Sequence, residues 1–157
     1  MKVSFAYIGK TSYSFVQEAC NLYFNRIKHY CKFEEVLIED VKKAGTLSPD
    51  QLKLEEGKKL LAKIDNKDFL VLLDEKGKDF TSVAFASWIE QKQVQGISSL
   101  VFVVGGAYGF SKEVYDRANM KLQLSKMTFS HQIIRAIFAE QLYRAFTIIK
   151  GEPYHNE

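Results

Sequence analysis

Short apolar runs and longer amphipathic stretches alternate along the whole chain. Residues 2–8 are β-branched and aromatic and are followed by Gly9, as in a strand that ends in a turn. Residues 69–73 and 99–104 are nearly continuous apolar runs, which is typical of strands covered on both faces of a sheet. Strands are therefore expected at 2–8, 32–38, 69–73, 99–104 and 120–124.

Capping residues mark helix starts between these strands. Ser48 followed by Pro49 is a start signal, because serine accepts the first free backbone N–H bonds and proline loses nothing at the first helical position. Helices are expected from Ser12 or Ser14 to Ile27, from Ser48 to about Ile64, from Thr81 or Ser82 to Gln95, from Ser111, and from Ser130 to about Lys150.

The first and the last predicted helix carry helically spaced apolar residues, whereas the segment 39–46 has no apolar pattern. Residues 39–46 are polar, contain Gly45 and are predicted to form the most mobile loop. In the first helix the helically spaced residues are Phe15, Ala19, Leu22, Tyr23, Arg26 and Ile27. In the last helix one stripe contains Ile134, Ile137, Phe138, Leu142, Ala145 and Ile149.

Strands that alternate with helices predict an α/β domain with a mostly parallel sheet flanked by helices. A length of 157 residues fits a single domain, expected over 1–157, and 46% apolar with 26% charged residues is ordinary for a globular protein. These values exclude a fibrous or natively disordered chain.

The amino-terminal residues lack the apolar core and cleavage site of a secretory signal, and no apolar stretch approaches the length of a membrane span. Cys20 and Cys31 have no CxxC spacing and fit a reducing compartment. A cytoplasmic protein is expected. The net charge of +3 is compatible with an RNA partner but does not require one.

The glycines of GGAYGF are the sharpest chemical feature of the sequence. Gly105, Gly106 and Gly109 directly follow a buried strand and precede a helix. Glycines let the backbone approach a ligand, and ligands of open α/β sheets bind beyond the carboxyl ends of strands. A tight turn explains the same glycines equally well. The GGxxG spacing matches neither the dinucleotide fingerprint nor a P-loop, so neither NAD nor ATP is favoured.

Two further segments could carry chemistry. His131 and Arg135 are four residues apart near a helix start, where an anion such as phosphate would be held. A capped helix with two solvated polar residues is the alternative. Tyr154 and His155, after Pro153, could stack on a base and move a proton, or belong to a frayed, inert tail.

Other reaction classes lack support in the sequence. The histidines His29, His131 and His155 have no metal-ligand spacing, so no metal site is expected. No GxSxG motif is present, and neither cysteine has a histidine in a suitable context, so nucleophilic hydrolysis is unsupported. Glu140 and Arg144 are expected to form an intrahelical ion pair.

GGAYGF, LSKMTFSHQIIRAIFAEQLYRAF and the end GEPYH, in this order, resemble the small ribosomal RNA pseudouridine N3-methyltransferases of the SPOUT class. The resemblance extends over the chain, including EGKKLLAKI from Glu56, and is strongest from residue 99 onward. It implies a deep trefoil knot, a homodimer whose active site is completed by the partner subunit, and 23S ribosomal RNA in the assembled ribosome as substrate.

The resemblance also implies S-adenosyl-L-methionine as cofactor, held in the knotted loops. Carried onto this sequence, the cofactor residues are Leu73, Gly105, Leu124, Ser125, Lys126, Met127, Thr128 and Phe129. The catalytic candidates are His131 and His155 as bases, Tyr154 to position the base, and Arg135 or Arg144 to hold RNA phosphates.

Two departures from the family pattern occur in the last third of the chain. Ser130 stands where relatives often carry proline; it supplies an N-cap, and the fold is expected to survive the change. Asn156 and Glu157 follow His155 where relatives often carry a basic residue, which leaves a phosphate contact from the tail unsupported. A non-catalytic RNA-binding module and a nucleotide-dependent oxidoreductase are the rival interpretations.

Overall fold

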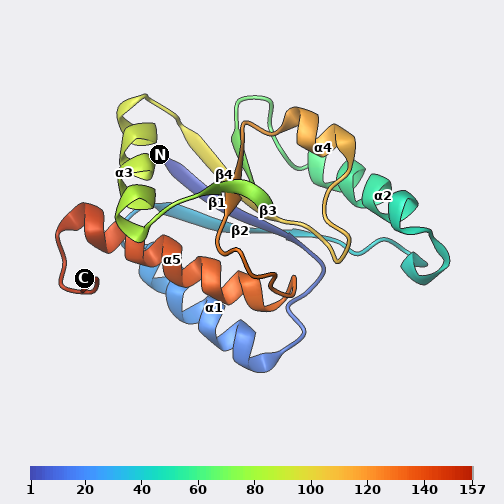
Figure 1. Ribbon diagram of the computed structural model, residues 1–157, viewed down its shortest axis with the longest axis horizontal. Helices are drawn as coiled ribbons and strands as arrows, with labels where there is room; N and C mark the ends of the chain where they lie inside the picture. The colour runs from blue at the N-terminus through green and yellow to red at the C-terminus, as the bar shows by residue number, and fades with distance from the viewer. Residues whose placement is uncertain (157) are drawn as a thin grey trace.

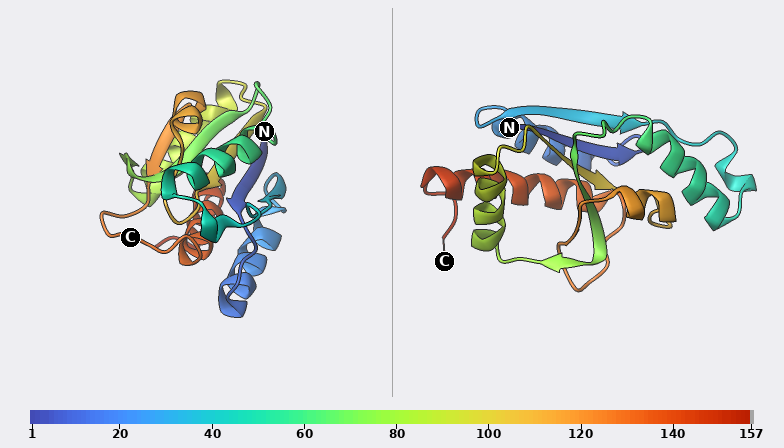
Figure 2. Two further views of the ribbon diagram at one scale, coloured as in Figure 1. Left: turned by 90° about the vertical axis from the view of Figure 1, so that its right-hand side faces the viewer. Right: turned by 90° about the horizontal axis from the view of Figure 1, so that it is seen from above.

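The computed structural model describes residues 1–156 and consists of one parallel sheet covered by helices on both faces (Figures 1 and 2). Glu157, the last residue of the domain expected over 1–157, lies outside the described residues. The strands are β1 (Lys2–Ile8), β2 (Lys32–Ile38), β3 (Phe69–Asp79), β4 (Ser99–Val104) and β5 (Met120–Gln123). The helices are α1 (Ser14–Ile27), α2 (Pro49–Leu61), α3 (Ser82–Val94), α4 (Lys112–Arg117) and α5 (Ile133–Lys150), with a short 3₁₀ turn at Ala44–Thr46.

The strand order is β2-β1-β4-β3-β5, and every neighbouring pair is parallel. The carboxyl ends of β4, β3 and β5 therefore lie side by side at one edge of the sheet. The α/β class with a parallel sheet, expected from the alternation of strands and helices, is confirmed.

Two apolar cores lie on the two faces of the sheet. On one face α1, α3 and α5 pack against alternate strand residues. The Phe138 ring of α5 packs at a tilt against Phe5 and Phe102, with centroid distances of 5.0 and 4.8 Å. On the other face Leu60 of α2 and Val114 of α4 cover the remaining side chains of β1, β3 and β4. Strands covered on both faces are apolar throughout, which explains the continuous runs in the sequence.

Strand β3 is longer than its apolar run predicts. It continues past Leu73 through a polar segment to Asp79, and its pairing with β5 shifts between Leu73 and Lys78. Gly77 allows β3 to pass this close to β5, because a Cβ at this position would lie 2.6 Å from the backbone of Leu122. The polar composition of the extension hid it from an analysis based on apolar runs.

The faces of the two long helices also differ in part from the predicted stripes. In α1 the buried residues are Val16, Cys20, Phe24 and Ile27, whereas Phe15 and Leu22 are exposed. In α5 Phe138, Leu142 and Ala145 are buried as expected, but the buried face also contains Arg135. Within residues 1–156 no helix has both the length and the apolar composition that crossing a bilayer requires.

Candidate functional site

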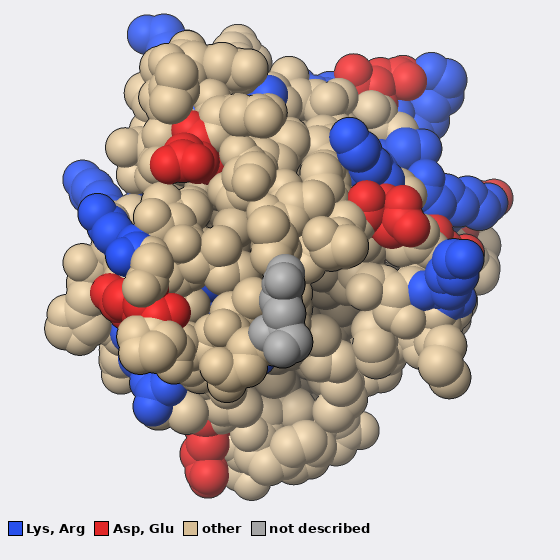
Figure 3. All heavy atoms as spheres, turned by 60° about the vertical axis from the view of Figure 1, so that its left-hand side comes forward, with Lys and Arg blue, Asp and Glu red and all other residues tan. Residues whose placement is uncertain are grey.

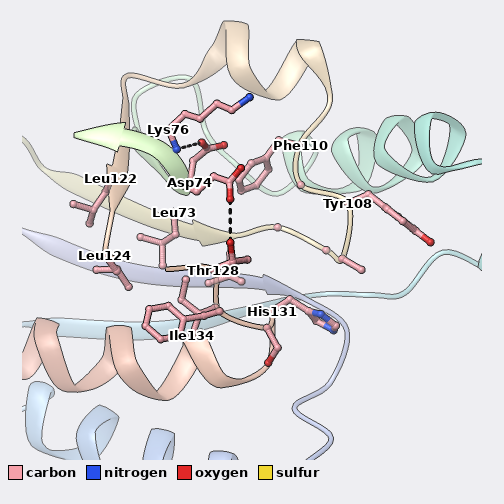
Figure 4. Close-up of a pocket in the computed structure, with 18 of the residues that line it drawn as sticks. Leu73, Asp74, Lys76, Tyr108, Phe110, Leu122, Leu124, Thr128, His131 and Ile134 are labelled. Carbon is pink, nitrogen blue, oxygen red and sulfur yellow. Dashed lines mark hydrogen bonds between the residues drawn. The ribbon is translucent and has the colours of Figure 1, made fainter. Parts of the chain in front are cut away.

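A cavity of about 530 Å³ opens at the carboxyl ends of β3, β4 and β5 (Figure 4). Leu73 at the apolar end of β3, the glycine loop after β4 and the loop between β5 and α5 form its walls. These segments are far apart in sequence and meet because the three strands are neighbours in a parallel sheet. The cavity lies where open α/β sheets bind their ligands, and its volume is within the roughly 300–1,000 Å³ of small-molecule sites.

The glycine loop forms both a tight turn and a wall of the cavity. Gly109 has a φ of +79°, a conformation that favours glycine, and its N–H donates to the carbonyl of Gly106 at 3.2 Å. Gly105 is buried, and a Cβ there would lie 3.2 Å from the Phe110 ring and 3.3 Å from the Gly109 carbonyl oxygen. The tight turn is thus confirmed, and the same loop lines the cavity, whereas ligand binding by this wall stays a prediction.

The loop between β5 and α5 supplies most of the other expected cofactor residues. Leu124, Ser125, Met127, Thr128 and Phe129 line the cavity, whereas Lys126 does not. Local hydrogen bonds order this loop. The Ser125 hydroxyl accepts the Met127 N–H at 2.9 Å, and the Thr128 hydroxyl donates to the Glu75 carboxylate at 3.3 Å.

Ser130 caps the start of the next helix from outside it. Its hydroxyl accepts the Ile133 N–H and its carbonyl accepts the Ile134 N–H, both at 3.1 Å. The regular helix nevertheless begins at Ile133, three residues later than Ser130. His131 therefore lies in a turn before α5, and there it lines the cavity.

His131 is the histidine of this cavity wall (Figure 4). Burial lowers its pKa, the neighbouring Arg135 guanidinium lowers it further, and Asp40 offsets a part of the shift. A lowered pKa keeps the imidazole neutral at physiological pH. A neutral imidazole can accept a proton from a ligand in the cavity.

Arg135 is fully buried, which contradicts the expectation that it holds RNA phosphates. Its guanidinium donates to the carbonyls of Ile8 at 2.7 Å, Gly9 at 3.0 Å and His131 at 3.0 Å. It also donates to the Thr11 hydroxyl at 3.1 Å and lies 4.4 Å from the centroid of the Tyr7 ring. A side chain without exposed surface cannot contact a phosphate, so Arg135 ties the His131 turn to the end of β1.

The helical spacing of Arg135 could have predicted this burial. Residue 135 precedes the buried Phe138, Ala139 and Leu142 by three, four and seven positions, which places all four on one helical face. The charge of arginine led us to expect solvent exposure, and the spacing to neighbouring apolar residues was the better guide.

The remaining candidates form a separate cluster at the carboxyl-terminal half of α5. Tyr154 donates to the Glu140 carboxylate at 3.0 Å, and Arg144 forms the expected ion pair with Glu140 at 2.5 Å. The Arg144 guanidinium lies 4.8 Å from the centroid of the Tyr154 ring and donates to Nδ1 of His155 at 3.3 Å. The Tyr143 ring meets Tyr154 edge-on at 4.7 Å. The tail is therefore held in place by several contacts.

This cluster does not reach the cavity of its own chain. Neither Tyr154 nor His155 is among the residues that line the cavity, and the tail leaves the end of α5 opposite to His131 (Figure 1). The middle of the face seen in Figure 3 is mostly uncharged, and both basic and acidic side chains lie toward its periphery.

No group of three or more His, Cys, Asp or Glu side chains among residues 1–156 is arranged to hold a metal ion. The prediction that no metal is used stays a prediction. The cavity wall combines apolar side chains, hydroxyls and one histidine with the charged residues Asp74, Glu75 and Lys76, which is a set suited to a polar organic ligand.

Comparisons with known proteins point to one family. Residues 1–155 match a family model described as "Predicted SPOUT methyltransferase". A relative from Christiangramia forsetii, named "Ribosomal RNA large subunit methyltransferase H", is 49% identical over 156 residues, which are 99% of each chain. Proteins of the same name from Parabacteroides distasonis and Bacteroides fragilis are 52% and 46% identical over 157 residues, with full coverage of both chains.

Proposed function

The chain belongs to the SPOUT methyltransferase family, and we propose that it transfers a methyl group from S-adenosyl-L-methionine to N3 of a pseudouridine in 23S ribosomal RNA. Relatives that match over their whole length are named as large-subunit ribosomal RNA methyltransferases, which supports the RNA substrate. The observation that carries the proposal is the cavity at the carboxyl ends of β3, β4 and β5.

The residues of this cavity fit the cofactor. Its volume of about 530 Å³ is sufficient for a nucleoside-sized ligand, and the space beside Gly105 would be narrowed by any side chain at that position. Leu73, Leu124 and Phe129 offer apolar surface to an adenine ring. Backbone groups of the two loops can bind its polar edge. When bound, S-adenosyl-L-methionine supplies a methyl group already activated by the sulfonium.

The protein then has to align the methyl donor with the attacking nitrogen and to remove one proton. Alignment converts the reaction of two molecules into a reaction within one complex, and a closed cavity excludes water. The N3 imide loses its proton as it attacks, so a neutral base beside the cavity is needed. His131 meets both conditions, because it lines the cavity and burial lowers its pKa.

Tyr154, His155 and Arg144 enter the proposal through a second subunit. These residues are ordered but lie away from the cavity of their own chain. In a homodimer the tail of one subunit completes the cavity of the other, with Tyr154 positioning the base, Arg144 contacting RNA phosphates and His155 as the alternative base. The trefoil knot that the family implies, which would hold the two loops together, is part of the same proposal.

A small chain with a net charge of +3 neutralises few phosphates, so it is poorly suited to bind naked RNA tightly. A dimer doubles the basic surface. Assembled ribosomes add shape and protein contacts, and we therefore propose the ribosome in the cytoplasm as the working substrate.

The test is transfer of labelled methyl from S-adenosyl-L-methionine to intact ribosomes from cells that lack this gene, followed by mass spectrometry of the large-subunit nucleosides. Methylated pseudouridine is the expected product. Cofactor binding without any labelled nucleoside would instead identify a non-catalytic RNA-binding module.

A further inference from the structure

Glu56 on α2 is a buried acid next to the glycine loop. Its side chain is 8% exposed, and its Oε2 atom is buried without a hydrogen-bond partner among residues 1–156. A Cβ placed on Gly106 would lie 2.5 Å from Oε2 and 2.7 Å from Oε1 of this carboxyl group. The carboxyl group therefore occupies the space that any side chain at position 106 would need.

Glu56 and the cavity lie against the same loop but do not face each other. Gly106 lines the cavity, whereas Glu56 does not. Helix α2 is held close to this region by a second glycine, because a Cβ on Gly57 would lie 2.6 Å from the Ser111 hydroxyl. Glu56 thus supports the glycine loop from α2 without belonging to the ligand-facing wall.

This arrangement is unfavourable in the protein without ligand. Burial raises the pKa of Glu56, and the negative charge of Asp40 raises it further. A buried carboxyl oxygen without a donor costs stability, so a purely structural position would be better filled by an apolar residue.

The missing donors are present in the adjacent loop. Within the described chain the backbone N–H groups of Ala107 and Tyr108 donate no hydrogen bond, and both residues are exposed. Ala107 directly follows Gly106, which touches the carboxyl group. A small rotation of this loop toward α2 would transfer these donors from solvent to the Glu56 oxygens, so that the buried carboxyl oxygen would gain a partner.

We propose that Glu56 is a positioning residue for the cofactor: its carboxyl group accepts hydrogen bonds from the backbone of residues 106–108 and fixes the glycine loop in its ligand-bound position. The inference rests on the proposed function, since it takes the cavity to be the cofactor site. Glu56 touches the loop and not the ligand, and it acts by lowering the cost of ordering the loop when the cavity is filled.

The experiment compares Glu56→Met, which keeps the length of the side chain but removes both acceptors, with Glu56→Gln, which retains one. Binding of S-adenosyl-L-homocysteine is measured by calorimetry, and the denaturation midpoint is measured without ligand. Glu56→Met is expected to raise the midpoint and to weaken binding at least about tenfold, since the lost bonds involve a charged acceptor. Glu56→Gln is expected to recover a large part of the affinity.

Amide hydrogen exchange distinguishes a positioning role of Glu56 from a merely structural one. In the wild-type protein the amides of Ala107 and Tyr108 are expected to become protected when S-adenosyl-L-homocysteine binds, and in Glu56→Met they stay unprotected at saturating ligand. Glu55→Met is the matched control, because Glu55 precedes Glu56 on α2 and pairs with Lys58 at 2.7 Å on a more exposed face.

Each outcome decides a different question. Unchanged affinity and loop protection in Glu56→Met, or a parallel loss of stability and affinity, would overturn the role of Glu56. Failure of the wild-type protein to bind S-adenosyl-L-homocysteine would remove the proposed function and this inference with it.

Discussion

The two ends of α5 use the same type of side chain for opposite purposes. Arg135 in the first turn is fully buried and donates to backbone carbonyls of the same chain. Arg144, further along the helix, is 24% exposed and contacts Glu140 and His155, which are side chains near the surface. The guanidinium at the first end makes its hydrogen bonds inside the chain, whereas the polar groups at the second end lie near the surface.

This difference indicates that the cavity wall and the cluster around Tyr154 are arranged for different reasons. A guanidinium bonded to backbone fixes the position of the His131 turn, so the cavity wall depends on folding alone. The cluster around Tyr154 adds little to the core and lies away from the cavity, so its arrangement has no evident purpose within a single chain. We infer that folding accounts for the first end and recognition of a second surface for the other.

The largest expected effect comes from replacing the two arginines in turn. Arg135→Met leaves several buried carbonyls without a donor and is expected to lower the free energy of unfolding by about 3–5 kcal/mol. Arg144→Met breaks a partly exposed ion pair and should cost about 1 kcal/mol. Chemical denaturation of both variants provides the measurement. Equal losses would show that the two ends of α5 do not differ in this way.

Gly105→Val tests the cavity end without changing any charge. Its Cβ would already lie 3.2 Å from the Phe110 ring, and two further methyl groups would narrow the cavity. We expect binding of S-adenosyl-L-homocysteine to weaken about a hundredfold, or roughly 2.7 kcal/mol. Gly45→Val is the matched control, because a Cβ at Gly45 would meet nothing within 4 Å. Wild-type affinity in Gly105→Val would separate the cavity from cofactor binding.

The order of the elements could be predicted from the sequence because each strand and helix carries its own local signal. The start of α2 follows from Ser48 and Pro49, and the structure has the complete capping box there. The polar extension of β3 could not be found in this way, because its pairing with β5 depends on a contact between Gly77 and a distant strand. Local patterns carry no information on such contacts.

The site was predictable to the extent that it lies at strand ends. Gly105 and the 124–129 loop follow strands, and a parallel sheet brings such segments to one edge, although Lys126 does not line the cavity. The burial of Arg135 was missed because side-chain chemistry was given more weight than helical spacing. Sequence motifs suggested Tyr154 and His155 as candidates, but no local pattern indicates that they lie away from the cavity of their own chain.

Mixed dimers test whether the tail serves the partner. Gly105→Val lacks a working cavity, and a chain with Tyr154→Ala and His155→Ala lacks a working tail, so neither homodimer is expected to transfer methyl groups. If tails act across the dimer, refolding both chains together restores about a quarter of wild-type activity, because half of the dimers then have one complete site of two. Methyl transfer to ribosomes is the measurement. No recovery would place the tail in the site of its own subunit, and full activity of the tail variant alone would place the tail outside catalysis.

The smallest expected effect concerns the proton on His131. Its pKa is lower in the folded chain than the usual value near 6.5, since burial and Arg135 disfavour the charged ring. The neutral ring therefore contributes stability that is fully present above about pH 6.5 and is lost as the pH falls through the folded pKa. Denaturation at about pH 7.5 and about pH 5 should show a smaller loss on acidification for His131→Gln than for the wild-type protein.

The exposed His29 provides the control for this measurement, because His29→Gln removes a histidine outside the cavity. An identical loss of stability on acidification in His131→Gln and the wild-type protein would contradict the lowered pKa. It would also weaken the case for His131 as the base, since a ring that is protonated near neutral pH cannot accept the N3 proton. The acid titration of His131 thus tests both its contribution to stability and its proposed role as the base.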